Sequence, residues 1–391
     1  MNVKSSGLNN NTLKQRNRGL ILKLIATQEC TSRIELAKKT GLSKVAVSHI
    51  VSEFIKDDII EELDAKPIKG QGRNPIHLSI SSKAPKMLGI YIFRDECSAV
   101  LCDIQLNVLK RSGFLLNAEN AGSLFSLLCQ SIDKVLKSAG DERIYGMGIG
   151  ALGPIDIEKG MILNPPHFYG VRDLPIVDML KERYKIPVYF DSQYNCAALA
   201  EKYYGNGKDY QDFIFVGIAN GIGSGIISNG TLYSNVSGYT SELGHMSVEW
   251  NGNQCICGNK GCLETYAGAR VIEEKLQKMT GEVLDFEGFC KRSYEKYDSI
   301  SDDIFMDMMD KLACGITSSV NLLNPAAVFI GHQGYYIPEQ YIRYLEEKIN
   351  AQKLVSSYCY VKVLKSYFRE ETHIRACGCS LLLRIFEGEL F

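Results

Sequence analysis

The chain of 391 residues contains no apolar run that approaches the roughly 20 residues needed to cross a bilayer. Its polar start, from Met1 to Gln15, also lacks the apolar core of a secretory signal. These absences predict a cytoplasmic protein that does not bind membranes. With 45% hydrophobic residues the chain can bury a substantial core, and its length predicts two or three domains. No short-period repeat points to a solenoid.

Disulfides are not expected either. Thirteen is an odd number, so the cysteines cannot all pair within one chain. A protein that is not exported stays in the cytoplasm, where thiols are kept reduced. Three of them, Cys255, Cys257 and Cys262, lie too close together in the sequence to be read as ordinary core residues. The remaining ten are interpreted as small buried apolar side chains.

The net charge of −1 conceals a local surplus of positive charge. Residues 1–44 carry nine Lys or Arg against two Glu, which gives +7. Such a surplus suits a DNA backbone, because lysine and arginine contacts release counterions from the phosphates. A solvated basic tail has the same composition, so charge alone does not decide between the two.

The segment that follows has the pattern of a helix-turn-helix. Apolar residues among basic ones predict a first helix over 12–27. Ser32 and Glu35 match a capping box, which predicts a second helix to about Thr40, and Ser43 can cap a third. The third helix has an apolar face made of Val47, Ile50, Val51 and Phe54. A helix in this position can enter the major groove of DNA.

The exposed side and the start of the third helix supply the candidate DNA contacts. These are Ser43, Lys44, Val45, Ser48 and His49. Val45 is apolar on a face expected to meet solvent, and this fits contact with a thymine methyl as well as it fits an incidental exposed valine.

Two short strands, at 59–63 and 76–80, flank a loop that reads Gly-Gln-Gly-Arg-Asn-Pro over 70–75. This is the pattern of a wing, and Arg73 at its tip can lie in the narrow minor groove. Residues 1–82 are therefore predicted to be a winged helix-turn-helix DNA-binding domain. The alternative for this segment is a small three-helix module that binds a protein.

From Lys86 onward, short β-branched runs alternate with helical segments, which predicts an α/β effector domain over 83–391. Strands are expected at 87–93, 99–103, 145–150, 187–191, 213–218 and 224–227. A glycine-rich turn joins the last two strands, and taken alone it indicates no more than a tight hairpin.

A cluster of potential metal ligands lies within this domain. Cys255, Cys257 and Cys262 have the spacing Cys-x-Cys-x4-Cys, and His245 precedes them. One nitrogen and three sulfurs suit tetrahedral zinc, and four protein ligands leave no open coordination position. A structural Zn²⁺ is therefore the expected cofactor, with four unrelated core residues as the alternative.

The same region resembles the signature of the ROK family of repressors and sugar kinases. It reads Ser-Glu-Leu-Gly-His-Met over 241–246 and Cys-Ile-Cys-Gly-Asn-Lys-Gly-Cys-Leu-Glu-Thr-Tyr-Ala over 255–267. Gly-Pro-Ile-Asp at 153–156 and the strands around 219–225 also look like the family, and the resemblance covers nearly the whole chain. It implies a two-lobed, actin-like (ribonuclease-H-like) fold. The small lobe would span about 83–190 plus the C-terminal helix, and the large lobe about 191–370.

The resemblance also implies a sugar site between the lobes. The positions that match the family's sugar contacts are His167, Ser192, Gln193, Glu242, His245 and Glu264. His167 stands where family members have an asparagine. Such groups bind hydroxyls that many pyranoses share, so xylose, glucose, N-acetylglucosamine and oligosaccharides all remain open.

Two departures from the family's kinases indicate that catalysis is lost. The first phosphate loop, Gly-Ile-Asp-Ile-Gly-Gly-Thr-Lys in the kinases, reads Gly-Ile-Tyr-Ile-Phe-Arg-Asp-Glu over 89–96, so no ATP is expected. Gln193 stands at the aspartate that takes a proton from the sugar, and glutamine cannot accept it. Asp191 could replace that aspartate only if the alignment shifted by two residues. No catalytic residue is therefore assigned.

The resulting prediction is a sugar-responsive transcriptional repressor of a carbohydrate-utilisation operon, which sugar binding releases from DNA. Its expected partners are operator DNA, a small-molecule sugar and a second copy of the chain. One rival is an active sugar kinase with a DNA-binding appendage. Another is an effector domain that binds a protein of sugar uptake instead of a sugar. The two altered ATP elements favour the repressor over the kinase.

Overall fold

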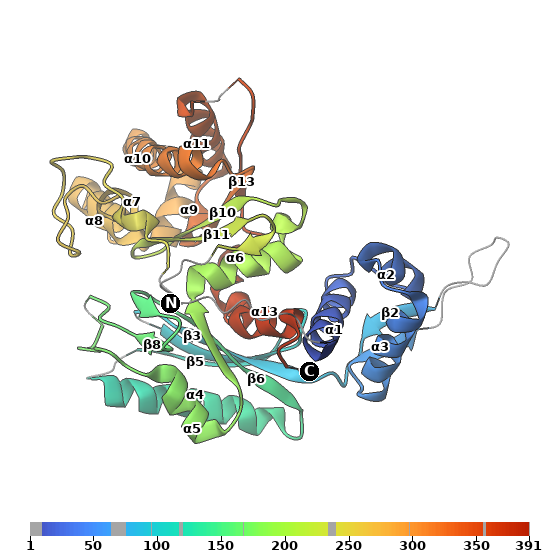
Figure 1. Ribbon diagram of the computed structural model, residues 1–391. Helices are drawn as coiled ribbons and strands as arrows, with labels where there is room; N and C mark the ends of the chain where they lie inside the picture. Colours follow the sequence, from blue (N-terminus) through green and yellow to red (C-terminus); the bar gives the residue numbers. More distant parts are fainter. Residues whose placement is uncertain are drawn as a thin grey trace, which may run out of the picture.

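The computed structural model describes residues 10–63, 76–94, 96–116, 120–166, 168–233, 240–296, 298–354 and 357–390. An N-terminal unit of three helices and a hairpin lies beside two lobes, each built on a five-stranded sheet (Figure 1). Among the described residues, no helix combines the length and the apolar character that crossing a membrane requires.

The N-terminal unit has the predicted order of elements. It contains α1 (Asn10–Ala26), α2 (Arg33–Thr40), α3 (Lys44–Lys56), β1 (Ile60–Leu63) and β2 (His77–Ile80). The two strands pair antiparallel, with Ile60 opposite Ile80. All four residues of the predicted apolar face of α3 are buried, which confirms its 3.6-residue pattern.

Local hydrogen bonds explain where these helices begin and end. The hydroxyl of Ser32 accepts the amide of Glu35 at 3.3 Å, and that of Ser43 accepts the third amide of α3 at 3.1 Å. The carboxylate of Glu35 accepts the amide of Thr31 at 2.7 Å, one residue before the predicted capping-box partner. Gly41 ends α2 with φ of 72°, a left-handed conformation that glycine adopts without steric cost.

The first lobe has the strand order β5-β4-β3-β6-β9. These strands are β3 (Lys86–Ile92), β4 (Glu96–Cys102), β5 (Val108–Leu115), β6 (Ile144–Ala151) and β9 (Val188–Ser192). A small hairpin, β7 (Ile155–Asp156) and β8 (Met161–Ile162), extends from it. Helices α4 (Ala121–Ala139) and α5 (Ile176–Tyr184) cover one face, and α12 (Thr372–Ala376) and α13 (Cys379–Glu387) cover the other.

The second lobe has the strand order β12-β11-β10-β13-β14. These strands are β10 (Phe213–Ile218), β11 (Ile222–Ser228), β12 (Thr231–Leu232), β13 (Ala327–His332) and β14 (Lys362–Lys365). Its helices include α7 (Glu264–Ala267), α8 (Ala269–Thr280), α9 (Phe286–Lys296), α10 (Ser299–Leu323) and α11 (Glu339–Gln352). All six predicted strands of the two lobes are present, whereas β5, β13, β14 and the two-residue strands β7, β8 and β12 were not predicted.

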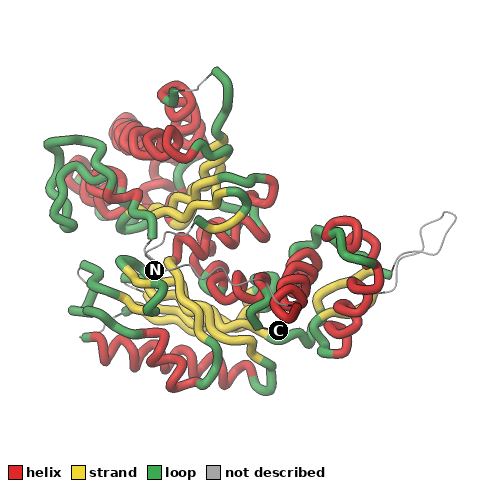
Figure 2. The backbone as a smooth tube through the Cα atoms, viewed as in Figure 1, coloured by secondary structure: helices red, strands yellow, loops and turns green. Residues whose placement is uncertain are grey.

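One helix joins the two lobes. Helix α6 (Gln193–Tyr204) contacts β10 and β11 of the second lobe as well as β6 and β9 of the first. Figure 2 shows it between the two sheets. It starts directly after β9, with Ser192 as its N-cap, so its first residues face the space between the lobes.

The N-terminal unit packs against the C-terminal helix of the chain. Helices α1 and α13 lie side by side, and their backbones approach closely at two glycines (Figure 1). A Cβ atom at Gly19 would overlap the carbonyl of Phe386 and lie 2.6 Å from the amide nitrogen of Gly388. A Cβ at Gly388, where φ is 85°, would overlap the carbonyl of Gln15. Larger residues at either position would separate the two helices.

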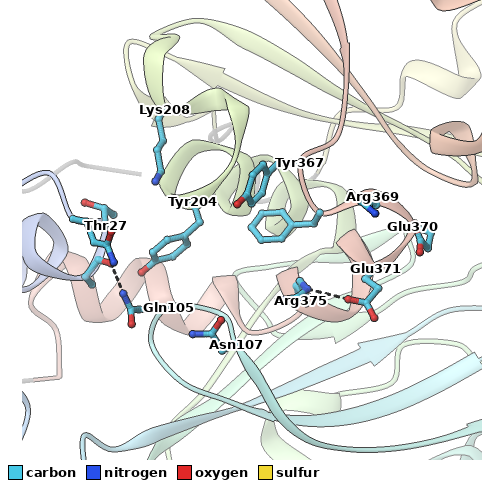
Figure 3. A pocket seen from close by; sticks show the side chains of 13 residues that line it. Thr27, Gln105, Asn107, Tyr204, Lys208, Tyr367, Arg369, Glu370, Glu371 and Arg375 are labelled. Atoms are coloured by element: carbon cyan, nitrogen blue, oxygen red, sulfur yellow. Dashed lines mark hydrogen bonds and ion pairs between the residues drawn. The ribbon is translucent and has the colours of Figure 1, made fainter. Parts of the chain in front are cut away.

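A cavity of about 720 Å³ opens beside this contact, between the end of α1, the β4–β5 turn and the 367–375 segment (Figure 3). Gln105 from the β4–β5 turn donates to the carbonyl of Ala26 at 3.1 Å. Tyr204, from the end of α6, also borders the cavity. The N-terminal unit, the first lobe and α6 therefore meet at one place.

Candidate functional site

The segments with the strongest sequence pattern meet in a cleft between the lobes. A cavity of about 430 Å³ there is lined by residues 152–154 before β7, the start of α6, the β10–β11 turn and the 240–264 segment. Five of the six predicted sugar contacts line it, namely Ser192, Gln193, Glu242, His245 and Glu264. The sixth, His167, lies outside the described residues, although its neighbours Asn164 and Pro166 line the cavity.

Gln193 is the most informative side chain of this cavity. It is 2% exposed, yet within the described part of the chain neither its amide oxygen nor its amide nitrogen has a hydrogen-bond partner. A buried polar group left unpaired costs about 1–3 kcal/mol. A ligand that both donates and accepts a hydrogen bond, as a hydroxyl does, would satisfy it.

Two carboxylates and a guanidinium add to the polar lining. Burial raises the pKa of Glu242, whose Oε1 accepts a hydrogen bond from Thr240 at 3.2 Å. Glu264 begins α7 on the opposite side. Arg94 donates to the carbonyl of Pro166 and lines the same cavity. Sequence reasoning missed Arg94 as a lining residue, because it was considered only as a replacement for a phosphate-loop glycine.

The predicted metal ligands come together at the edge of this cavity. The ligand atoms of His245, Cys255, Cys257 and Cys262 all lie within 4.8 Å of one another. The Sγ of Cys255 is 3.6 Å from Nδ1 of His245, and the sulfurs of Cys257 and Cys262 are 3.6 Å apart. Zinc bonds of about 2.0–2.3 Å in a tetrahedron place ligand atoms about 3.5–3.8 Å apart, so the four residues fit the group.

The metal cluster and the cavity share residues. Nδ1 of His245 faces the cysteines and lies 3.6 Å from Oε1 of Glu264, which is also 3.4 Å from the sulfur of Cys255. Because Nδ1 is on the metal side, Nε2 is the ring nitrogen left for a ligand in the cavity. An ion bound here would fix the positions of both His245 and Glu264.

The other cysteines are mostly in the core, as predicted. Eight of the ten are buried, and no described cysteine is in a disulfide. The prediction is wrong for Cys314, which is exposed on α10, and for Cys359, which is half-buried in the loop before β14. Neither side chain is fully covered by neighbouring residues, so neither belongs to the core.

The position of Asp191 bears on the loss of catalysis. Asp191 is buried in β9, and its Oδ1 accepts the amide of Ser192 and the side-chain amide of Asn195, both at 2.7 Å. Burial raises the pKa of Asp191 to about 6. It does not line the cavity that contains Gln193, and its hydrogen bonds fix the junction between β9 and α6.

The candidate DNA-contacting residues occupy one exposed side of α3. Val45 is 80% exposed, and Ser43, Lys44 and His49 are also exposed, whereas Ser48 is half-buried. Nδ1 of His49 lies 3.3 Å from a carboxylate oxygen of Glu53, one turn further along α3. Arg73 lies outside the described residues.

Comparisons with known proteins agree with these observations. The profile of the ROK family matches residues 87–374. A xylose repressor of Caldicellulosiruptor bescii is 27% identical over 387 residues, which cover 94% of this chain and 96% of that protein. The DNA-binding transcriptional dual regulator NagC of Escherichia coli is 28% identical over 383 residues, covering 95% of this chain and 93% of that protein.

A solved structure confirms the predicted fold. The crystal structure of a ROK family transcriptional regulator, described as a homologue of the Escherichia coli MLC protein, superposes with a TM-score of 0.83. The two chains are 24% identical, and the match covers 97% of this chain and 98% of that one. Since the match includes the N-terminal unit, a winged helix-turn-helix followed by a two-lobed α/β fold describes the whole chain.

Proposed function

The chain belongs to the ROK family, and from this premise we propose that it is a transcriptional repressor whose affinity for DNA is controlled by a sugar. Relatives named as repressors match it over nearly their whole length, including the N-terminal unit. The observation that carries the sugar proposal is Gln193, whose two buried polar atoms have no partner among the described residues and which lines a cavity that also contains carboxylates.

The cavity suits a polyhydroxy ligand. Glu242 and Glu264 accept hydrogen bonds from hydroxyls, Arg94 donates to ring or hydroxyl oxygens, and Gln193 does both. His167 and Ser192 belong to the proposed contact set by the family resemblance. The volume of about 430 Å³ is within the range of small-molecule sites, so a monosaccharide fits without opening of the lobes.

The proposal includes binding without phosphoryl transfer. At neutral pH the amide of Gln193 cannot take a proton from a sugar hydroxyl, and Asp191 is engaged outside the cavity. Loss of a general base typically slows such a reaction by about 10²- to 10⁴-fold. Tyr91 and Phe93 replace residues of the kinases' phosphate loop, so ATP is not part of the proposal.

We further propose a structural zinc held by His245, Cys255, Cys257 and Cys262. Bound there, the ion supplies four ligand bonds and no open position for chemistry. The chain's own residues then act in fixed places. The imidazole of His245 presents Nε2 to the sugar, and Glu264 is kept beside it.

DNA binding is assigned to residues 1–82, and sugar and zinc binding to residues 83–391. In this proposal α3 enters the major groove, where Ser43, Lys44, Val45, Ser48 and His49 face the DNA, and Arg73 reaches the minor groove. A homodimer would place two such helices on a pseudo-palindromic operator. One module alone gives only modest affinity, which supports a dimer.

The test is a titration of sugars against DNA. An operator would first be selected from random DNA by the full-length protein, and its affinity measured by fluorescence anisotropy with each sugar of a panel that includes xylose, glucose and N-acetylglucosamine. One sugar should weaken operator binding by roughly 5- to 150-fold, the usual range of allosteric coupling. The same mixture with ATP should yield no sugar phosphate. Robust phosphorylation, or no response to any sugar, would refute the proposal.

A further inference from the structure

A second cavity, of about 400 Å³, lies between the lobes on the other side of Phe93. Its charged lining consists of five carboxylates and one guanidinium: Glu96, Asp285, Glu287, Glu370, Glu371 and Arg111. Glu96 belongs to the first lobe, Asp285 and Glu287 to the second, and Glu370 and Glu371 to the segment that links β14 to α12. The acidic groups therefore face one another across the opening between the lobes.

These carboxylates are only partly compensated. Arg111 pairs with Glu96 at 2.6 Å, so its charge compensates that carboxylate and not the other four. Glu287 pairs with Lys291 on α9, at 2.6 Å. Glu371 pairs with Arg375 at 3.0 Å, and Oδ1 of Asp285 accepts the amide of Gly288 at 2.7 Å. Within the described part of the chain, Asp285 and Glu370 form no ion pair, so Glu370 is the least compensated of the five. Such a lining repels phosphate groups and attracts cations.

Aromatic rings distinguish an organic cation from a hydrated metal ion. Tyr91 and Phe93 are stacked in this cavity with ring centroids 5.9 Å apart, and the ring of His373 lies 4.7 Å from that of Tyr91. A ring face binds an alkylammonium group by about 0.5–2 kcal/mol, and Phe93 is the partly exposed ring here, because Tyr91 is 3% exposed between Phe93 and His373. A hydrated metal ion would gain nothing from such a ring.

Two buried acceptors point to a ligand that donates hydrogen bonds. His332 lines the cavity, is 4% exposed, and its Nε2 has no partner within the described residues. Burial lowers the pKa of His332 well below its usual value, so the ring is neutral, and Nε2 accepts a hydrogen bond in the tautomer that carries its proton on Nδ1. The side-chain oxygen of Gln333, beside it, is buried and unpartnered as well, and it can only accept.

We propose that this cavity is a second effector site, which binds an organic cation carrying primary or secondary amines, of the class of aliphatic polyamines. The amines would lie between the carboxylates of both lobes, against Phe93, and donate to His332 and Gln333. Since the ligand bridges carboxylates that otherwise repel one another across the opening, it favours the closed arrangement of the lobes. The proposal is independent of which sugar occupies the first cavity.

The test uses full-length, DNA-free protein without sugar and spermidine as the probe. Isothermal titration calorimetry should detect one spermidine per chain, and spermidine should raise the melting temperature. Glu287→Gln should weaken binding roughly two- to fivefold, the effect of one partly exposed ion contact. Glu274→Gln is the matched control, because Glu274 forms the same kind of i,i+4 pair with Arg270 but lies outside the cavity.

A second variant guards against misfolding. Glu370 is exposed and forms no described ion pair, so Glu370→Gln should weaken spermidine binding as Glu287→Gln does while the melting temperature of the free protein stays unchanged. Three results would overturn the proposal: equal weakening by Glu274→Gln, which marks nonspecific attraction; displacement of spermidine by equimolar Mg²⁺, which marks a metal site; or binding of ATP in its place. Because no sugar or operator is present, failure here leaves the sugar-controlled repressor untouched.

Discussion

Replacing Gln193 should separate sugar binding from stability, and the two effects should have opposite signs. Methionine has nearly the shape of glutamine and no strong hydrogen-bonding group, so Gln193→Met keeps the packing at the start of α6. It removes two buried polar atoms that have no partners in the described part of the protein. Removing such a desolvated amide should stabilise the sugar-free protein by about 1–3 kcal/mol.

The same change should weaken the sugar complex. With sugar bound, the amide of Gln193 would be paired, and its loss removes hydrogen bonds worth about 1–3 kcal/mol, or roughly 5- to 150-fold in Kd. Urea denaturation of the free protein and calorimetric titration with the effector sugar would measure the two effects. The operator affinity without sugar should not change, since α6, which begins at Gln193, and α3 lie in different parts of the molecule (Figure 1).

Asn195 provides the contrasting control two residues along the same helix. It is equally buried, but its side-chain amide donates to Asp191 at 2.7 Å. Asn195→Leu should therefore destabilise the protein, because it breaks a buried hydrogen bond to a carboxyl group. If Gln193→Met also destabilised the protein and left sugar affinity unchanged, the assignment of Gln193 as an unsatisfied ligand contact would be wrong.

Three further predictions follow from the site and its surroundings. Purified protein should carry about one zinc per chain by elemental analysis, and Cys257→Ala should lose the metal and weaken sugar binding; a metal-free protein of full stability would contradict this. The pKa of Asp191 is about 6 in the folded protein against about 3.9 when unfolded, so its contribution lowers stability as pH rises from about 4 to about 6. Asp191→Asn should remove that part of the slope, about 3 kcal/mol in all, from urea denaturation measured across this range, and an unchanged slope would refute the assignment. Gly19→Ala should force α1 and α13 apart, at a cost of about 1–3 kcal/mol, and reduce the sugar's effect on operator binding in anisotropy titrations; an unaltered sugar response would show that this helix contact does not transmit the signal.

The elements that were predicted from the sequence are those with a local signal. The face of α3 follows from 3.6-residue spacing, and β10 and β11 follow from β-branched runs around a glycine turn. Strand β13 was missed although it is as fully buried as β10, because only two of its six residues, Val328 and Ile330, are β-branched and no glycine turn to a second such run follows it. The edge strand β14 has four residues and gives little signal of either kind.

The site was predictable only where one segment contains several of its residues. His245, the three cysteines and Glu264 fall within 20 residues of sequence, so spacing alone brought them together. In the sequence, Arg94 is separated from them by about half of the domain, and only the packing of the two lobes against each other brings it to the same cavity. The unpaired state of Gln193 likewise depends on neighbours from three different segments, which no local pattern encodes.

Helix α6 gives the proposed control a physical basis, because its two ends lie at the two places that must communicate. Gln193 at its start lines the sugar cavity, and Tyr203 near its end packs against Phe386 of α13, with ring centroids 5.1 Å apart. The ammonium group of Lys23, on α1, lies 5.2 Å from the centre of the Tyr203 ring. A helix without a kink moves as a rigid rod, so a displacement at one end also moves the other end. Helix α6 rises about 1.5 Å per residue and contains no Pro or Gly. A shift of α6 on sugar binding would therefore move α13 and α1 together, and with them α3, the helix proposed to contact DNA, which packs on α1.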